Sequence, residues 1–240
     1  MEKIFGKHSV RAVFLTRPDD IRRMVIAGKI EYHKEFIDLA RRNGINYEFL
    51  SWPEFRRLGE FEEHDKHQGI LILVKPRPTY NEKDLDLLKT GRCIFAVDQI
   101  SNPQNFATII RSAAFFGVDG IITTRNRAAD LSQTVVRYAV GGAEFVKVFT
   151  VINLSRTLNE LKSMGFWAYG LDERGQKTLA ETEFAEKTVF VVGAEGQGLR
   201  RKTRINCDEL VRIPGGIKGV ESLNAAVAAS IAMSEIFRLK

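Results

Sequence analysis

Cysteine and long apolar runs are scarce in this sequence of 240 residues. Its two cysteines, Cys93 and Cys207, each lie in or beside an apolar or helical segment, which indicates buried thiols rather than a disulfide. The longest apolar runs, such as ILILV at 70–74, are far shorter than the roughly 20 residues of a membrane-spanning helix. Residues 1–10 contain no apolar core of a signal peptide. The sequence therefore predicts a cytoplasmic protein without a membrane partner.

Clustered metal ligands and a hydrolytic triad are also missing. His64 and His67 stand three residues apart, but neither a cysteine nor a cluster of carboxylates lies near them, so no metal is expected. The glycine-rich segment GAEGQG contains no serine, which excludes a nucleophile elbow. No Ser/His/Asp set is spaced in a way that suggests hydrolysis.

Positive charge, in contrast, is in excess: 36 Lys and Arg stand against 30 Asp and Glu, for a net charge of +6. Such an excess favours a polyanionic partner. It is spread along the chain rather than gathered in one part. The densest cluster is RRKTR at 200–204, for which a nucleic-acid contact and a solvated helix face both remain open.

Two stretches of alternating helix and strand patterns are separated by a segment with two prolines. The first stretch, 1–74, is predicted to be a small α/β unit, and 75–91, which contains KPRPTYNEKD, has the composition of a mobile linker. In the first stretch, helices are expected at 6–15, 32–44 and 53–59, and strands at 22–28, 45–50 and 67–75.

The second stretch, 92–240, has strands that are nearly continuous apolar runs, as is typical of a parallel sheet covered on both faces. The sequence therefore predicts a second α/β domain. Its strands are expected at 93–98, 120–124, 145–149, 166–171, 188–193 and 210–213, and its helices at 106–116, 131–140, 153–164, 199–206 and 222–238.

The first notable motif is NPQNFATIIRSAAFFG at 102–117, which follows the first strand of this domain. Its apolar residues form one helical stripe, and Arg111 lies about 140° away from that stripe. Asn105 is expected at the helix N-cap. A capping asparagine and a solvated arginine would explain the pattern without function. However, Phe115 shares the outward side with Arg111, which suggests a second interface such as a subunit contact.

The second motif, VVGAEGQGL at 191–199, is a strand that runs into a glycine-rich turn. Gly193, Gly196 and Gly198 allow a close approach of the backbone to a ligand, or positive φ angles in a structural tight turn. The order of glycines matches neither a P-loop nor the dinucleotide-binding fingerprint. The latter would also follow the first strand, which argues against a nicotinamide-dependent oxidoreductase. Glu195 within the turn favours a functional site.

The third motif spans 212–237, where a strand ending at Pro214 precedes a loop with three glycines and an alanine-rich helix. Ser222 and Asn224 are expected in the first helical turn, where side chains and free N–H groups can bind a ligand. An ordinary capped helix is the alternative. Small residues at 225, 226, 228, 229 and 232 would permit close packing.

Together the three motifs resemble the SpoU/TrmH family of RNA ribose 2′-O-methyltransferases. In that family a strand leads into an Asn…Arg helix, a later strand into a G-x-E-G-x-G turn, and a strand ending in Ile-Pro into a Ser-Leu-Asn helix. The matching stretches here read NFATIIR, GAEGQG and IP…ESLN. The N-terminal stretches IFGKHSVRAVF and HQGILILVKP are similar to the L30e-like RNA-binding domain of the bacterial 23S rRNA guanosine 2′-O-methyltransferases. The resemblance spans nearly the whole chain.

The resemblance implies an α/β fold with an L30e-like RNA-binding domain over 1–74, a linker over 75–91, and a deep-trefoil-knot methyltransferase domain with a mostly parallel sheet over 92–240. It implies S-adenosyl-L-methionine as cofactor, RNA as substrate and a homodimer. Catalytic roles are implied for Asn105, Arg111, Glu195, Ser222 and Asn224. Cofactor binding is implied for Gly193, Ala194, Glu195, Gly196, Gly198, Ile213, Pro214 and Leu223.

The implied reaction is methyl transfer to a ribose 2′-hydroxyl, with a guanosine of 23S rRNA as the expected acceptor. Two alternatives stay open, a tRNA ribose 2′-O-methyltransferase and a catalytically silent RNA-binding protein with the same fold. Arg111 is expected to act as a general base or as a clamp on phosphate and the forming alkoxide. A guanidinium with a pKa above ~12 favours the clamp.

Overall fold

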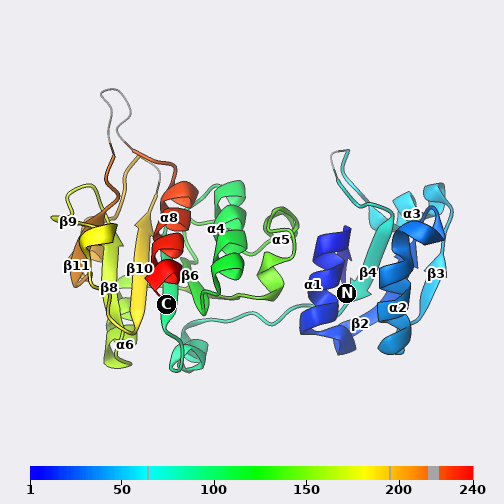
Figure 1. The fold of residues 1–240 in the computed structure, drawn as a ribbon, viewed down its shortest axis with the longest axis horizontal. Coiled ribbons are helices and arrows are strands. Elements are labelled where there is room, and N and C mark those ends of the chain that lie inside the picture. Colours follow the sequence, from blue (N-terminus) through cyan, green and yellow to red (C-terminus); the bar gives the residue numbers. More distant parts are fainter. Residues whose placement is uncertain (64, 195, 216–221, 240) are drawn as a thin grey trace. The chain divides into compact units, whose positions relative to one another are not determined.

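The computed structural model describes residues 1–63, 65–194, 196–215 and 222–239 (Figure 1). The chain divides into two compact units, Met1–Pro78 and Thr79–Lys240. In chain order the first unit contains β1 (Glu2–Phe5), α1 (Lys7–Thr16), η1 (Pro18–Asp20), β2 (Ile21–Ile26), η2 (Ile30–His33), α2 (Lys34–Arg42), β3 (Tyr47–Phe49), α3 (Trp52–Gly59) and β4 (Ile70–Val74).

The first unit is built around a four-stranded mixed sheet with the order β1-β4-β2-β3. Strand β4 is antiparallel to both β1 and β2, whereas β2 and β3 are parallel. Successive residues of β2 point to opposite faces, as strand geometry requires. Met24 and Ile26 pack in the cluster that includes α1 and α2, and Val25 packs with Phe55 of α3. The sequence predicted α1, α2, α3, β2, β3 and β4, but it missed β1 and η1, and the helix expected at 32–44 covers only part of η2.

The second unit contains, in chain order, η3 (Glu82–Leu88), β5 (Cys93–Asp98), α4 (Pro103–Phe116), β6 (Gly120–Thr124), α5 (Gln133–Tyr138), η4 (Gly142–Glu144), β7 (Lys147–Val151), α6 (Leu154–Ser163), β8 (Trp167–Leu171), β9 (Lys177–Thr178), η5 (Leu179–Glu181), β10 (Thr188–Gly193), α7 (Arg201–Ile205), β11 (Glu209–Arg212) and α8 (Ala225–Leu239). Its described strands form one seven-stranded sheet in the order β7-β6-β5-β10-β8-β11-β9. Every strand pair of that sheet is parallel, which confirms the predicted fold class.

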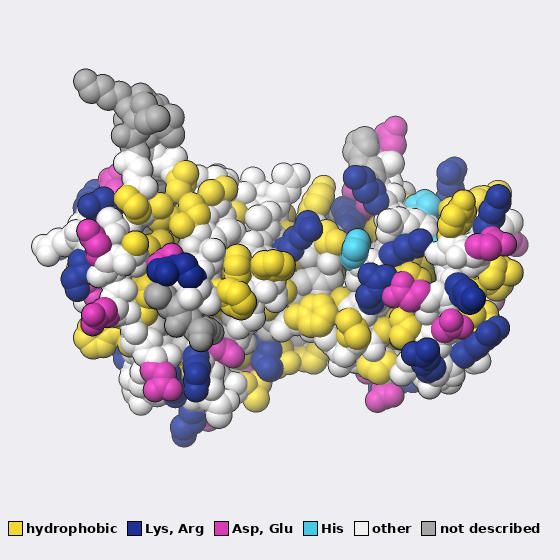
Figure 2. Space-filling model, in the orientation of Figure 1, with side chains coloured by type: hydrophobic (Ala, Val, Ile, Leu, Met, Phe, Trp, Pro, Cys, Tyr) yellow, Lys and Arg dark blue, Asp and Glu magenta, His cyan; other side chains and the backbone are white. Residues whose placement is uncertain are grey.

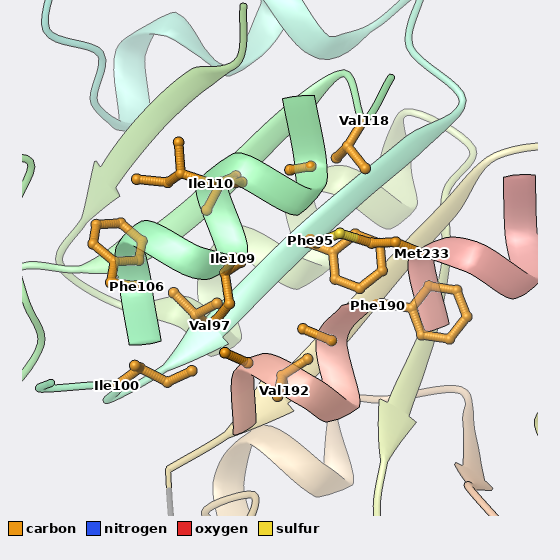
Figure 3. Close-up of a cluster of buried hydrophobic side chains, with 14 of the residues drawn as sticks. Phe95, Val97, Ile100, Phe106, Ile109, Ile110, Val118, Phe190, Val192 and Met233 are labelled. Carbon is orange, nitrogen blue, oxygen red and sulfur yellow. The ribbon is translucent and has the colours of Figure 1, made fainter. Parts of the chain in front are cut away.

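Both faces of this sheet are buried, and alternate residues of β5 enter the two cores. Phe95 and Val97 pack in one core with α4 and α8, together with Phe190 of β10 (Figure 3). Ile94 packs in the other core with α6. The Phe95 and Phe190 rings stack with centroids 5.3 Å apart, which joins the two central strands. Helices α4 and α8 therefore cover the same face of the sheet.

Part of the expected linker belongs to the second unit. The sequence predicted a linker over 75–91, but Glu82–Leu88 forms the 3-10 helix η3. Leu85 and Leu88 are each 1% exposed and join the core that contains Ile94. The apolar spacing of these two leucines, three residues apart, explains why this segment packs against the sheet rather than remaining extended.

Helix α4 begins three residues earlier than expected because Asn102, and not Asn105, is its N-cap. The side-chain oxygen of Asn102 accepts hydrogen bonds from the N–H groups of Gln104 at 2.8 Å and Asn105 at 3.4 Å. Pro103 follows at the first helical position, where no N–H is needed. The expectation of a capping Asn105 is therefore wrong, and this side chain lies within the first turn.

Helix α8 begins at Ala225 rather than at the expected residue 222. The side-chain oxygen of Asn224 accepts hydrogen bonds from the N–H groups of Ala226 at 2.9 Å and Val227 at 3.2 Å. Asn224 is thus the N-cap, and Ser222 precedes the helix. Within the described residues, no helix is both long and apolar enough to cross a membrane.

Candidate active site

Three loops meet at one edge of the seven-stranded sheet. They follow β8, β10 and β11, which are neighbouring parallel strands, so that their carboxyl ends lie together. The loops border a cavity of about 830 Å³, within the range of roughly 300–1,000 Å³ that is usual for small-molecule sites. The wall is formed by Leu171, Asp172, Glu173, Arg174, Val192, Gly193, Ala194, Gly196, Gln197, Gly198, Leu199, Arg204, Val211, Arg212, Ile213, Pro214, Gly215, Ser222, Leu223, Ala225 and Ala228.

The loop after β10 is a tight turn that folds back onto the strand it leaves. The N–H of Gly198 donates to the carbonyl of Ala194 at 2.9 Å. Gly196 and Gly198 have φ angles of +73° and +61°, a region that favours glycine. A Cβ on Gly193 would lie 2.1 Å from the carbonyl carbon of Gly198. The geometry of the turn alone therefore explains these glycines, and it also leaves bare backbone along the cavity.

A charged loop after β8 forms another part of the wall, and the sequence analysis missed it. A side-chain oxygen of Asp172 accepts from the N–H of Arg174 at 3.0 Å, and the N–H of Gly175 donates to the carbonyl of Asp172 at 3.0 Å. A Cβ on Gly175 would lie 2.6 Å from the carbonyl carbon of Val211, so the loop lies directly against β11. The signal available in the sequence was an Asp-x-x-Gly turn after an apolar strand.

The first and third motifs meet through two asparagines. Nδ2 of Asn224 donates to Oδ1 of Asn105 at 3.2 Å, although the two residues are 119 positions apart. Helices α4 and α8 are also joined by the hydroxyls of Ser112 and Ser230 at 2.8 Å. The small residues of α8 therefore serve to pack this helix against α4 within one chain. Four of them are at most 5% exposed: Ala225, Ala226, Ala229 and Ala232.

Arg111 lies on the exposed side of α4, away from the buried stripe of that helix, as predicted. Among the described residues, no hydrogen bond or ion pair holds its guanidinium. Its backbone is fixed instead, because a Cβ on Gly142 would lie only 3.0 Å from the Cα of Arg111. Phe115, one turn further along α4, is 80% exposed and lies on the outward side of the helix, as predicted.

The basic cluster at 200–204 is divided between two environments. Arg200 binds Asp98, with 2.6 Å between Nη2 and Oδ1, and Arg204 lies 3.7 Å from Asp172 (Nη1 to Oδ2). These two arginines thus neutralise carboxylates of the same unit. The other two cations are exposed and, within the described part of the chain, pair with no carboxylate; they are Arg201 and Lys202.

The predicted site residues fall into three groups. Ser222 and most of the expected cofactor-binding residues line the cavity: Gly193, Ala194, Gly196, Gly198, Ile213, Pro214 and Leu223. Outside the described cavity wall, but on α4 or at the start of α8, are Asn105, Arg111 and Asn224. Glu195 lies outside the described residues, and so does any contact between it and Arg111.

The histidines predicted not to bind metal lie in the first unit. His64 lies outside the described residues, whereas the ring of His67 packs 4.5 Å from that of Phe61 and 5.7 Å from that of Trp52. Burial lowers the pKa of both His33, which is 3% exposed, and His67. The described residues contain no group of three or more His, Cys, Asp or Glu side chains arranged for a metal ion.

Both cysteines are free thiols, Cys93 buried and Cys207 half-buried, as the sequence predicted. Burial raises the pKa of Cys207 to about 12. Cys207 is therefore protonated at neutral pH and is a poor nucleophile.

Comparison with known proteins shows the family to which both units belong. The SpoU rRNA Methylase family matches residues 92–234, and the family of RNA 2'-O ribose methyltransferase substrate binding domains matches residues 3–80. The Pseudomonas aeruginosa protein named 23S rRNA (guanosine-2'-O-)-methyltransferase RlmB is 32% identical over 243 residues, which cover 99% of this chain and 96% of that protein.

Two further proteins are similar over nearly the whole chain. The uncharacterized tRNA/rRNA methyltransferase slr0955 of Synechocystis sp. is 34% identical over 245 residues, and the chain spans 62% of the length of that relative. The solved structure of the SpoU methyltransferase AviRb from Streptomyces viridochromogenes, in complex with AdoMet, has a TM-score of 0.78 at 23% identity. That alignment covers 99% of this chain and 89% of the other, so the two proteins share their fold.

Proposed function

This chain belongs to the SpoU rRNA Methylase family, and from that premise we propose that it transfers a methyl group from S-adenosyl-L-methionine to the ribose 2′-hydroxyl of a guanosine in 23S rRNA. The name of the Pseudomonas aeruginosa relative supports this acceptor, since the two chains align over almost their full lengths. The observation that carries the proposal is the cavity at the carboxyl ends of β8, β10 and β11. It lies beside the start of α8, whose cap contacts α4.

The residues of the cavity fit the cofactor. Its volume suits a ligand of nucleoside size, and Gly193 leaves no room for a side chain between the turn and its strand. When bound, S-adenosyl-L-methionine supplies an electrophilic methyl group on a sulfonium. The turn from Gly193 to Gly198 and the segments at Ile213 and Leu223 would hold it, mainly through backbone groups.

Arg111 would act on the RNA rather than on the cofactor. It is exposed on α4, outside the described cavity wall. Because a guanidinium is a permanent cation, Arg111 would bind a phosphate or stabilise the oxyanion that forms at the 2′ position. Asn105 and Asn224 hold α4 and α8 together at this point and orient the ribose. Much of the rate enhancement would come from this alignment.

The first unit would select the RNA. Residues 3–80 match the substrate-binding family, and the visible face of this unit carries Lys and Arg side chains interspersed with Asp and Glu (Figure 2). A segment around 75–79 connects it to the second unit. We keep the proposed division into an RNA-binding domain, a linker and a methyltransferase domain, with the linker shorter than 75–91. A ribosomal RNA substrate would place the protein in the cytoplasm.

The active form would be a homodimer. Phe115 is 80% exposed, and the ring of its neighbour Phe116 packs 5.8 Å from that of Phe237, which is 58% exposed on α8. A second copy that covers this surface would remove large apolar side chains from water. The trefoil knot is also a proposal. The strand order supports it. Strand β10 lies between β5 and β8, and β11 lies between β8 and β9, so that each is flanked by strands that precede it in the sequence, as a threaded C-terminal segment would require.

The test is to incubate the full chain with tritiated S-adenosyl-L-methionine and either a 23S rRNA fragment or tRNA, and then to digest the RNA to nucleosides. We expect label in 2′-O-methylguanosine from the rRNA fragment. Label in tRNA instead would contradict the assignment of rRNA as the substrate but would support the assignment of the reaction. RNA and cofactor binding without any label would identify a catalytically silent RNA-binding protein.

A further inference from the structure

Asp98 is a buried carboxylate at the end of β5 that the proposed mechanism does not use. Its side chain is fully buried, and it does not belong to the described wall of the cavity. A buried carboxylate is stable only with charged or hydrogen-bonding partners. Its partners are therefore informative about why a carboxylate is placed there.

Both carboxylate oxygens of Asp98 are bound by residues that follow the glycine turn. Nη2 of Arg200 lies 2.6 Å from Oδ1, and Nε of Arg200 donates to Oδ2 at 3.1 Å. The hydroxyl of Thr203 donates to Oδ2 at 2.6 Å. Thr203 is itself fully buried, so that its hydroxyl depends on this bond. Arg200 contacts the carboxylate through one hydrogen bond, at Oδ2, and one close ion pair, at Oδ1.

Asp98 also lies beside the start of the same turn. In the parallel pairing of β5 and β10, Asp98 is in register with Gly193, the residue from which the turn departs. The chain leaves the sheet next to Asp98, makes the turn that lines the cavity, and returns to Asp98 through Arg200 and Thr203. The carboxylate thus binds the exit of the turn, and the backbone of Asp98 pairs beside its entry.

We propose that Asp98 is a positioning residue for the cofactor turn: it fixes the exit of the turn through Arg200 and Thr203 while strand pairing fixes the entry. This inference rests on the proposed function, because that function assigns the cofactor to this turn. The tip of the turn needs such support, since a Cβ at Gly196 or Gly198 would meet nothing within 4 Å. Asp98 also ends the strand that leads to α4, so it links the cofactor turn to the helix that carries Arg111.

The test is Asp98→Asn in the full chain, with Asp208→Asn as matched control. Asp208 also binds a cation and a backbone N–H, Nζ of Lys162 and the N–H of Ala168, each at 2.8 Å, but it touches neither the turn nor the cavity. Calorimetric titration with S-adenosyl-L-methionine should show a Kd at least ~10-fold weaker for Asp98→Asn and within about twofold of wild type for Asp208→Asn. Equal effects of the two substitutions would overturn the proposal.

A gentler pair of variants decides the matter if Asp98→Asn does not fold. Thr203→Val keeps the volume and removes the hydroxyl, whereas Thr203→Ser keeps the hydroxyl. We expect roughly threefold to tenfold weaker cofactor binding for Thr203→Val, and near wild-type binding for Thr203→Ser. Equal binding by the two threonine variants would contradict the role of the carboxylate contact.

Hydrogen exchange separates this inference from the proposed function, because it needs no cofactor. Amides of a peptide spanning 193–199 should exchange faster in Asp98→Asn and Thr203→Val than in Asp208→Asn. If the wild-type chain binds no S-adenosyl-L-methionine, the proposed function fails while faster exchange would still support the positioning role. Unchanged exchange in this peptide would overturn the positioning role even in a protein that binds the cofactor.

Discussion

The two units of this chain differ in what they expose: the second has a cavity at the ends of its strands, and the first has a surface of charged and titratable side chains. In the second unit, a glycine-rich turn, a charged loop and apolar side chains border a cavity at the ends of parallel strands, and glycines stand at the closest backbone approaches. In the first unit, a mixed sheet carries charged and aromatic side chains, and all four histidines of the chain occur there, at 8, 33, 64 and 67. A tightly packed glycine turn tolerates little change in shape, whereas a surface that carries charged and titratable side chains responds to salt and pH.

The largest expected effect separates the two parts of the proposed site. Arg111→Ala should reduce methyl transfer by at least ~100-fold, since it would remove the cation that we propose stabilises the developing charge. The Kd for S-adenosyl-L-methionine should stay within a few-fold, because Arg111 lies outside the described cavity wall. Arg111→Lys should be nearly as damaging, because lysine cannot make a planar two-pronged contact.

The control for that experiment is Arg156→Ala, which removes an exposed arginine from α6 on the opposite face of the sheet. It should retain full activity. Equal losses of cofactor binding and of transfer in Arg111→Ala would show that Arg111 belongs to the cofactor site.

The next effect tests whether the cofactor site depends on backbone shape. Gly193→Ala places a Cβ 2.1 Å from the carbonyl carbon of Gly198, so the turn must move. We expect cofactor affinity to fall by roughly 10-fold or more. Gly44→Ala is the matched control, because its Cβ would meet nothing within 4 Å and Gly44 lies in the first unit, outside the described cavity wall. Its positive φ costs about 1 kcal/mol of stability, and its affinity should change little. The reverse ranking in calorimetry would contradict the assignment of the turn.

Salt should weaken the binding of RNA much more than the binding of S-adenosyl-L-methionine. If the first unit contacts RNA phosphates, binding of a labelled rRNA fragment should weaken with a slope of roughly −0.7 per single-strand phosphate in a plot of log affinity against log salt. For two phosphates that is about a sevenfold loss between 50 and 200 mM KCl, measured by anisotropy. Cofactor affinity should be nearly constant over the same range. A flat profile for RNA would argue against phosphate contacts.

The smallest expected effect is a pH dependence of stability confined to the first unit. Burial lowers the pKa values of His33 and His67 below the ordinary 6.5. The unfolded chain therefore binds protons first, so the stability of the first unit is fully present above pH 6.5 and falls as the pH drops below it, down to the folded pKa values. The second unit contains no histidine and should be insensitive between pH 7.5 and 5.5.

The two tryptophans allow the units to be followed separately, because Trp52 lies in the first and Trp167 in the second. Urea unfolding of Trp167→Phe, followed by the fluorescence of Trp52, should give a lower midpoint at pH 5.5 than at pH 7.5. The same measurement on Trp52→Phe should give equal midpoints. Equal shifts in both variants would show that the histidines are not the cause.

Local patterns were sufficient to predict most of the fold. The strands at 93–98, 120–124 and 188–193 have the predicted bounds, because each is an apolar run bordered by turn residues. The strand β9, only two residues long, carries no such pattern and was missed. Helix starts were less accurate, because the choice between Asn102 and Asn105 as N-cap depends on the path of the preceding loop.

The sequence predicted those parts of the candidate site that depend on neighbouring residues, but not those that depend on contacts between distant residues. The glycines at 193, 196 and 198 mark the turn within a few residues of sequence, and they line the cavity. The bond between Asp98 and Arg200 joins residues 102 positions apart, and no local pattern in the sequence pairs them. The loop at 172–175 was missed for the same reason, since its position in the wall depends on the pairing of β8 with β11.

The central claim is that the second unit binds the cofactor and the first selects the RNA. The most direct measurement compares the full chain with residues 79–240, first by calorimetric titration with S-adenosyl-L-methionine and then by methylation of a 23S rRNA fragment. We predict cofactor affinities within about twofold of each other, since every described residue of the cavity wall lies beyond 170. Methylation by the shortened chain should fall sharply. Equal methylation by both chains, or loss of cofactor binding in a folded 79–240, would contradict the claim.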